Sequence, residues 1–281
     1  TLIPNRGAWL EFEIDKENVF RVKVDRTGKV TFTTLLRALS PEMGSDEQII
    51  EVLGYDKGEA QGLASDEGKI FACDIIRQTL KRDQESNPPI ACHIDGLTEM
   101  YKKLRPGENA TVETMEERIA DTFFDPKRYD LSRVGRYKFN KKLALRGRIN
   151  GFTLAMPVAD PSTGEIIADA GEVISRDMAE KIDAAGVVEV WLDVDGKTVK
   201  VFSNGMVPLQ SMVDIDPEEL GIKEKVRGIV LKSLMEQYSG DALKEAILEN
   251  IDVLIPKHIV VDDMFASVNY LNCLAYGIGE K

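Results

Sequence analysis

Two segments near the start of the chain alternate between apolar and polar residues. Every second residue of 10–14 and of 20–24 is apolar, beginning in each case with the first. A period of two predicts strands with one buried face, and the polar residues between them predict a hairpin turn. If the apolar residues face the core, Trp9 lies on the exposed face together with Arg21 and Lys23.

Before residue 150, apolar residues otherwise recur every three or four positions, which predicts helices. Four of these helices span 34–39, 69–82, 94–104 and 111–123. A further helix begins after the capping residue Ser45 and ends at Gly54. The sequence Arg105-Pro106-Gly107-Glu108 predicts a turn, because proline biases the preceding residue away from the α region and glycine allows positive φ. The polar, glycine-rich stretch 58–68 is predicted to be the least structured part.

The pattern changes after residue 150. Residues 152–171 predict a hairpin, Ser175 caps a short helix, and residues 187–202 predict a second hairpin, in which Trp191 either packs in a crevice or meets a partner. Helical spacing returns over 223–237, 241–250 and 262–275. We therefore predict an α+β fold, a mixed domain of short helices and antiparallel strands (residues 1–150 and 205–281) with an inserted small β-rich module (151–204).

Composition places the chain among soluble globular proteins, since 43% of its 281 residues are hydrophobic and 30% are charged. It has no apolar run long enough to span a membrane and no signal-peptide pattern, so we expect a cytoplasmic protein. It starts at Thr1, directly before a strand-like segment, which is typical of a piece of a longer protein. Three widely spaced cysteines and two histidines predict neither a disulfide framework nor a metal site.

The most unusual feature is a basic segment, residues 123–148, in an acidic chain. Nine basic and two acidic residues give this segment a charge of +7, whereas the whole chain carries −12. Like charges this close repel one another unless an anion relieves them. Apolar and aromatic residues are interleaved throughout, which argues against a disordered tail. The segment therefore predicts a folded surface that presents Arg and Lys side chains to phosphates.

Other candidates for nucleic-acid contact lie outside this segment. Trp9 is predicted to be exposed, and cations including Arg26 and Lys29 lie near the ends of the same strands. An aromatic ring beside cations predicts a binding site for an unstacked base with its phosphate. The alternative is that Trp9 covers a neighbouring loop. Arg105 is held on a turn between two helices, where it either faces a ligand or satisfies helix-end carbonyl groups.

No motif for catalysis is present. The chain lacks a GxxxxGK[ST] phosphate loop, an HExxH zinc motif, a GxSxG nucleophile elbow and a GxGxxG fingerprint. The adjacent acids Asp262 and Asp263 point away from each other on a helix and make a poor metal pair. We therefore predict no catalytic residue and no metal ligand within this chain.

Three segments resemble the β subunit of bacterial DNA-directed RNA polymerase, in the region called the lobe. They are LIPNRGAWLEFEID with VDRTGKV and LLRAL in 2–39, YKKLRPGENAT in 101–111, and FFDPKRYDLSRVGRYKFNKKL in 123–143. The third is the most specific, because so long a run of mixed charged and aromatic residues does not recur by chance. A weaker similarity continues through 158–174 and 255–280.

The resemblance implies a lobe that forms one wall of the cleft for downstream DNA. By position, Trp9 would stack on a nontemplate-strand base just downstream of the start site, and Arg105 and Arg128 would touch the nontemplate strand upstream of it. Further nucleic-acid contacts are expected at Arg26, Lys29, Arg133, Arg136 and Lys138. The family usually has another cation where this chain has Gly28, which weakens the case for Arg26 and Lys29.

The resemblance also implies partners and a cellular place. These are DNA (nontemplate strand and downstream duplex), the rest of the β subunit, the β′ and α subunits and σ factor, at the nucleoid and without membrane contact. The fragment would hold no cofactor, because catalytic Mg²⁺ belongs to the β′ subunit in this family. The alternative to DNA contact is a docking module for σ factor or transcription regulators; a stand-alone nucleotidyl-transfer enzyme would need a carboxylate cluster that the sequence lacks.

Overall fold

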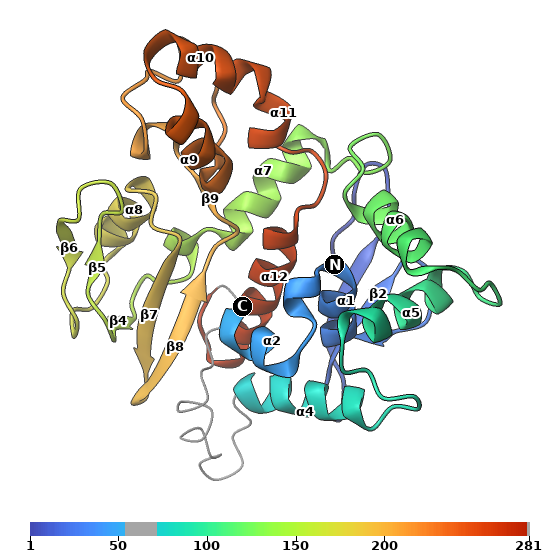
Figure 1. Cartoon of the computed structure of the whole chain (residues 1–281). Helices are drawn as coiled ribbons and strands as arrows, with labels where there is room; N and C mark the ends of the chain where they lie inside the picture. Colours follow the sequence, from blue (N-terminus) through green and yellow to red (C-terminus); the bar gives the residue numbers. More distant parts are fainter. Residues whose placement is uncertain (54–71, 280–281) are drawn as a thin grey trace. The chain divides into compact units, whose positions relative to one another are not determined.

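The computed structural model describes residues 1–53 and 72–279 (Figure 1). These residues form eleven α-helices and ten short strands in small antiparallel sheets, which confirms the predicted α+β class. The chain divides into two compact units. Unit 1 contains Thr1–Ser132 and His258–Met264, and unit 2 contains Arg133–Lys257 and Phe265–Lys281. The boundaries predicted at residues 150 and 205 stay a prediction.

Unit 1 begins with the predicted hairpin. Strands β1 (Leu10–Ile14) and β2 (Phe20–Val24) pair antiparallel from Leu10 opposite Val24 to Ile14 opposite Phe20, and β3 (Val30–Thr31) adds a third strand. The apolar side chains of β2 are buried, whereas Ile14 of β1 is 38% exposed because it lies next to the hairpin turn.

The helices of unit 1 pack around α1 (Phe32–Leu39), which is buried along nearly its whole length. The others are α2 (Asp46–Val52), α4 (Ala72–Gln84), α5 (His93–Leu104) and α6 (Val112–Phe123). The predicted Ser45 capping box is present on α2, but the predicted closing residue, Gly54, lies outside the described residues, as does the stretch 58–68. Gly96 lets α5 approach α1 closely, since an added Cβ would lie 2.6 Å from Arg37 Cβ.

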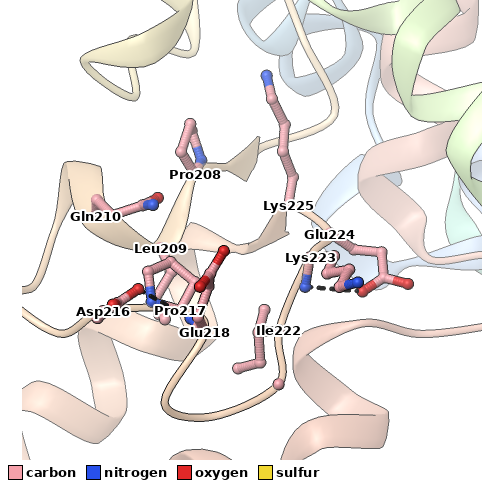
Figure 2. A pocket seen from close by; sticks show the side chains of 11 residues that line it. Pro208, Leu209, Gln210, Asp216, Pro217, Glu218, Ile222, Lys223, Glu224 and Lys225 are labelled. Carbon is pink, nitrogen blue, oxygen red and sulfur yellow. Dashed lines mark hydrogen bonds between the residues drawn. The ribbon is translucent and has the colours of Figure 1, made fainter.

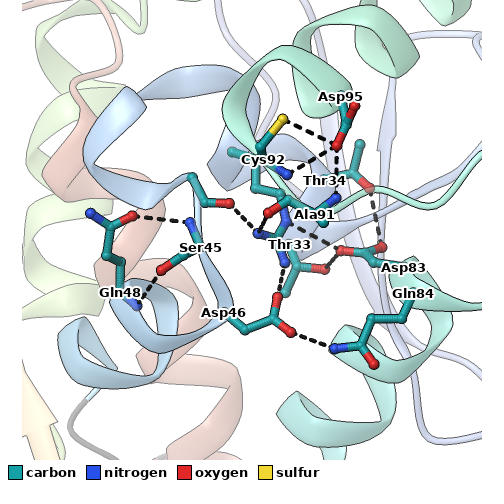
Figure 3. A network of polar contacts seen from close by, with 12 residues as sticks. Thr33, Thr34, Ser45, Asp46, Gln48, Asp83, Gln84, Ala91, Cys92 and Asp95 are labelled. Carbon is teal, nitrogen blue, oxygen red and sulfur yellow. Dashed lines mark hydrogen bonds and ion pairs between the residues drawn. The ribbon is translucent and has the colours of Figure 1, made fainter.

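A buried polar network fixes α4 against the start of α1 (Figure 3). The Asp83 carboxylate accepts hydrogen bonds from the hydroxyls of Thr31, Thr33 (2.5 Å) and Thr34 (3.2 Å). Arg37 is fully buried, with Nε 3.8 Å from Asp83 Oδ2, and it also binds Asp46. Burial raises the pKa of Asp83, although the threonine hydrogen bonds and Arg37 oppose that shift.

Unit 2 contains the strands predicted between residues 152 and 202. Strand β4 (Thr153–Leu154) pairs with β7 (Glu189–Val194), β7 pairs with β8 (Lys197–Phe202), and β5 (Val158–Ala159) pairs with β6 (Ile166–Ala168), while α8 (Arg176–Ala184) starts after its Ser175 cap. The core around these strands also includes Leu145, Ile149, Cys273 and Ile278, so residues on both sides of 151–204 pack into it.

A second core in unit 2 is formed by the segment 206–255. It contains β9 (Met206–Val207), β10 (Val226–Arg227), α9 (Gly228–Gln237), α10 (Gly240–Glu249) and α11 (Ile251–Leu254). The prediction of a helix from residue 223 is wrong for its first turn. Residues 226–227 instead pair with β9, and the Gly228 amide donates to the Gly205 carbonyl at 3.0 Å, which turns the chain into α9.

The remaining helices are α7 (Ser132–Leu143) and α12 (Val261–Ala275). Short 3-10 helices occur at Pro41–Met43, Leu145–Gly147 and Leu209–Ser211. Of the helices in the described part of the chain, none combines the length and the hydrophobicity that crossing a membrane requires.

Candidate nucleic-acid interface

Trp9 is fixed by its backbone while its ring stays accessible. The Trp9 amide donates to the Asp25 carboxylate at 2.6 Å, and its carbonyl accepts from the Asp25 amide at 2.8 Å. The residue is 49% exposed, as expected from the strand alternation. A rigid backbone with a half-exposed ring offers a stacking surface at low entropic cost.

Arg128 is brought toward Trp9 by the residue that follows it. The Tyr129 hydroxyl donates to the Ala8 carbonyl at 3.1 Å, and the Arg6 and Asp130 backbones exchange hydrogen bonds. Tyr129 is fully buried against Gly7. The segments that carry Trp9 and Arg128 are therefore neighbours, although more than a hundred residues separate them in sequence.

The Arg128 guanidinium itself is held by two carboxylates. It pairs with Asp121 and, at 3.3 Å, with Asp125, while its side chain remains 56% exposed. Such exposed pairs are worth little energy in water, so a phosphate can exchange for a carboxylate here.

Arg105 lies at the end of α5 and is exposed. At the end of the helix the Arg105 amide donates to the Tyr101 carbonyl at 2.7 Å, so the backbone of Arg105 satisfies this one carbonyl group. The predicted turn follows, with Gly107 at φ +82°. Among the described residues the Arg105 side chain has no carboxylate partner in any ion pair, so its charge faces solvent.

The turn between β2 and β3 carries Arg26 and Lys29 and lies against the end of α5. Lys29 pairs with Glu13 at 2.5 Å, whereas Arg26 is exposed. A Cβ added at Gly28 would meet Lys103 Cδ at 3.7 Å and Nζ at 3.9 Å. Lys103 therefore lies beside this turn, and its ammonium also pairs with Glu99 at 3.3 Å.

Two further cations, Arg21 and Lys23, lie on the same face of the β1–β2 hairpin as Trp9, and each lies near a carboxylate. Arg21 pairs with Asp15 at 2.9 Å and Lys23 approaches Glu11 at 3.8 Å, directly across the strand pair. Burial alone would raise the pKa of Asp15, but the hydrogen bonds from Arg21 and the Val19 amide outweigh it and the pKa is lowered.

The remaining candidates belong to unit 2 and differ from one another. Arg136 is buried, 2% exposed, and its Nε donates to the Pro256 carbonyl at 2.8 Å, so the prediction that it faces phosphates does not fit the structure. Arg133 pairs with Glu224, and this hydrogen bond holds the pKa of Glu224 below its ordinary value. Lys138 is exposed on α7.

Unit 2 also contains an open hollow of about 900 Å³ between residues 208 and 225 (Figure 2). Asp216, Glu218 and Glu224 line it together with Lys223 and Lys225. Its mixed charge favours no single anion. Among the described residues no group of three His, Cys, Asp or Glu side chains could hold a metal ion.

Comparison with known proteins places these residues in a family. Residues 1–154 match the family described as RNA polymerase Rpb2, domain 2. The chain belongs to this RNA polymerase family. It is 48% identical over 283 aligned positions to the DNA-directed RNA polymerase subunit beta of Acetivibrio thermocellus, 45% to that of Clostridioides difficile and 42% to that of Clostridium botulinum strain Okra. Each alignment covers 100% of this chain but 21% of the relative.

The membership confirms the family predicted from the three segments. The family match covers the whole of the Trp9, Arg105 and Arg128 neighbourhood. It ends inside unit 2, whereas the similarity to the bacterial subunits continues over the rest of the chain. The chain is thus a part of a polymerase β subunit, about one fifth of the length of these relatives.

Proposed function

We propose that this chain is the lobe of a bacterial RNA polymerase β subunit, where it forms one wall of the downstream DNA cleft and contacts the nontemplate strand. The supporting observation is that unit 1 gathers a half-exposed tryptophan and three accessible arginines from distant segments. The Trp9 amide is hydrogen-bonded to Asp25, the neighbour of Arg26, and Ala8 is hydrogen-bonded to Tyr129, the neighbour of Arg128. The turn that carries Arg26 lies against the end of α5, directly before Arg105.

This arrangement suits single-stranded DNA. An aromatic face can stack on a base of any identity, while flanking arginines bind the phosphates on either side of it. A duplex would keep its bases stacked and leave Trp9 without a partner. The nontemplate strand of an unwound segment is the polymerase ligand that fits these two requirements.

The chemistry of RNA synthesis is proposed to belong to the whole enzyme. In that assembly the rest of β, the β′ and α subunits and σ factor would be partners, and the β′ subunit would hold the catalytic Mg²⁺. This chain would contribute binding and position, and no catalytic group.

The test is binding of a fluorescent single-stranded oligonucleotide to the 281-residue chain at two salt concentrations. We expect binding that weakens as salt rises, because phosphate contacts release counterions, with a log–log slope of about −0.7 per contact. Trp9→Ala is expected to weaken binding without changing this slope, whereas Arg105→Ala with Arg128→Ala is expected to make it shallower.

The matched control is Arg176→Ala in unit 2, an exposed arginine paired with Glu180 at 3.4 Å. Its binding is expected to equal that of the unchanged chain. If the two interface variants also bind as the unchanged chain does, the proposed strand contact is wrong.

The second candidate function is docking of a protein partner, and the hollow of Figure 2 favours it. Its size and mixed charge fit a folded partner better than a polyanion. A folded chain that captures purified σ factor but shows no salt-dependent DNA binding would support docking over the strand contact.

A further inference from the structure

Unit 2 carries a basic hollow that is lined by unit 2 residues. It has a volume of about 170 Å³ and is bounded by α7, the following 3-10 helix and α12. Its lining consists of Lys138, Lys141, Lys142, Arg146, Gly147, Arg148 and Tyr270. We call this set the basic hollow; as far as the described residues define it, the lining contains five cations and no carboxylate.

The sequence positions its lysines on one side of α7. Lys138, Lys141 and Lys142 are spaced i, i+3 and i+4, so they are neighbours on the helix surface. Such like-charged neighbours destabilise a helix. The helix dipole offsets part of this cost because Lys141 and Lys142 lie in the last turn, but it corresponds to only about half a negative charge. Half a charge is less than the two unit charges of Lys138 and Lys141, which take part in no ion pair among the described residues.

Three of these cations are free to bind. Lys138, Lys141 and Arg146 are exposed, and within the described residues none of them takes part in an ion pair. Next to them, Gly147 has open space where a Cβ would stand, so a ligand can approach the backbone there. Unpaired cations in a concave site concentrate positive potential.

Arg148, on the other side of the basic hollow, is held in place by hydrogen bonds. Arg148 is 2% exposed and donates to the carbonyl groups of Leu143 (2.7 Å) and Phe202 (2.5 Å) and to Asn269 Oδ1 (3.2 Å). These acceptors are neutral, so its charge adds to the potential of the site. Burial lowers the pKa of Arg148 from its ordinary high value.

The aromatic ring of Tyr270 lies close to two of these cations. Lys142 Nζ lies 5.3 Å and Arg148 Cζ 5.9 Å from the centre of its ring. Because cations occupy the aromatic surface, the ring is a poor stacking partner for a base. The basic hollow therefore selects for negative charge and not for a base.

We propose that the basic hollow is a binding site for a compact phosphate anion, with Lys138, Lys141 and Arg146 donating to phosphate oxygens and Lys142 and Arg148 supplying fixed positive potential. The volume suits this ligand, since a single water molecule occupies about 30 Å³ of liquid and a phosphate group or a diphosphate fills several such volumes. The phosphate can come from a free polyphosphate or from a nucleic-acid strand. Nothing in this proposal depends on the unit 1 strand contact.

Calorimetric titration of the 281-residue chain with inorganic diphosphate at low ionic strength tests the site. We expect saturable binding at one site and weaker binding of sulfate at matched ionic strength. Lys141→Gln and Arg146→Gln are each expected to weaken diphosphate binding on the order of three- to tenfold, and more when combined, because each removes one charge-assisted hydrogen bond. Both residues are exposed, and circular dichroism checks that the variants fold.

The matched control is Lys232→Gln, an exposed lysine of α9 in the same unit. Diphosphate binding should not change in this variant, nor in Trp9→Ala. Absence of saturable binding, or equal loss in Lys141→Gln and Lys232→Gln, would overturn the proposal.

Competition then separates the two sources of phosphate. If an unlabelled single-stranded oligonucleotide displaces diphosphate, and does so equally in the Trp9→Ala variant, the basic hollow binds the phosphates of a strand. If diphosphate binding persists in excess oligonucleotide, the ligand is a free polyphosphate.

Discussion

Gly7 sets how closely the Trp9 and Arg128 segments approach. Its φ is +120°, which L side chains rarely adopt, and an added Cβ would lie 2.6 Å from Cδ2 of the buried Tyr129 ring. The fit of Tyr129 under Ala8 and Gly7 therefore depends on the missing side chain.

We expect Gly7→Ala to lower the free energy of unfolding by roughly 2–4 kcal/mol, from backbone strain and overpacking together. Urea unfolding measures the change. Gly147→Ala is the control, since that position has open space and no positive φ. Equal stability of the two variants would contradict this account of the Tyr129 contact.

Unlike Gly7, Gly28 occupies a position where the structure has room for a side chain. A Cβ would make an ordinary contact with Lys103 and the backbone is not in the left-handed region. Gly28→Arg should therefore strengthen single-stranded DNA binding and steepen its salt dependence by about 0.7 in the log–log slope, as one added phosphate contact would. Gly28→Gln is the control. If both variants bind equally, the turn that carries Arg26 does not meet the strand.

At the scale of elements, α4 and α1 depend on the Asp83 carboxylate. Asp83→Ala leaves Arg37 and three threonine hydroxyls buried with fewer partners, and we expect a loss of about 3–5 kcal/mol in urea unfolding. Asp83→Asn retains a hydrogen-bond acceptor of the same shape and should lose less. Similar losses in both variants would mean that the charge, and not the hydrogen bonds, holds the two helices.

The segment before β10 is joined to the start of α7 by an ion pair that titrates. The hydrogen bond from Arg133 lowers the pKa of Glu224 from its ordinary 4.5, so the folded state favours the ionised carboxyl. Its contribution to stability is present above pH 4.5 and is lost as the pH falls through the lowered value.

Acid unfolding tests this sign. Between about pH 6 and about pH 3 the stability of the unchanged chain should fall more than that of Arg133→Gln, in which the main cause of the shift is absent. Arg176→Gln removes an exposed pair on α8 and serves as the control. The same pH dependence in Arg133→Gln and in the unchanged chain would show that this pair is not formed in solution.

Local patterns predicted these elements well where neighbouring residues decide the structure. The hairpin of β1 and β2, the Ser45 capping box and the second hairpin, formed by β7 and β8, all follow from residues close in sequence. The start of α9 was mispredicted because residues 226–227 pair with β9, a contact that helical spacing does not encode.

The candidate site was predicted only in part for the same reason. The exposure of Trp9 follows from strand alternation, but the burial of Arg136 depends on the distant Pro256 carbonyl. Lys103 and the basic hollow likewise depend on which segments meet. Basic residues that look equivalent in a linear sequence thus divide into structural and accessible ones.

At the scale of the whole molecule, the two units divide the tryptophans between them. The chain has two tryptophans, Trp9 in unit 1 and Trp191 in unit 2, where Lys200 lies 5.5 Å from the Trp191 ring. Unit 2 has two buried apolar clusters, and unit 1 has buried apolar residues such as Leu36. Replacing one tryptophan with Phe therefore leaves a fluorescent reporter for the unit that retains the other.

We expect the units to differ in their response to core mutations. Leu192 and Leu36 are both fully buried, in unit 2 and unit 1 respectively, and Leu→Ala at such positions costs about 2–5 kcal/mol. Leu192→Ala should lower the urea midpoint reported by Trp191 and leave that reported by Trp9 nearly unchanged, and Leu36→Ala should do the reverse. If either mutation moves both midpoints equally, the two units unfold as one cooperative body. In that case a variant of the basic hollow has to be checked for its effect on Trp9 fluorescence before a change in DNA binding is assigned to a lost contact.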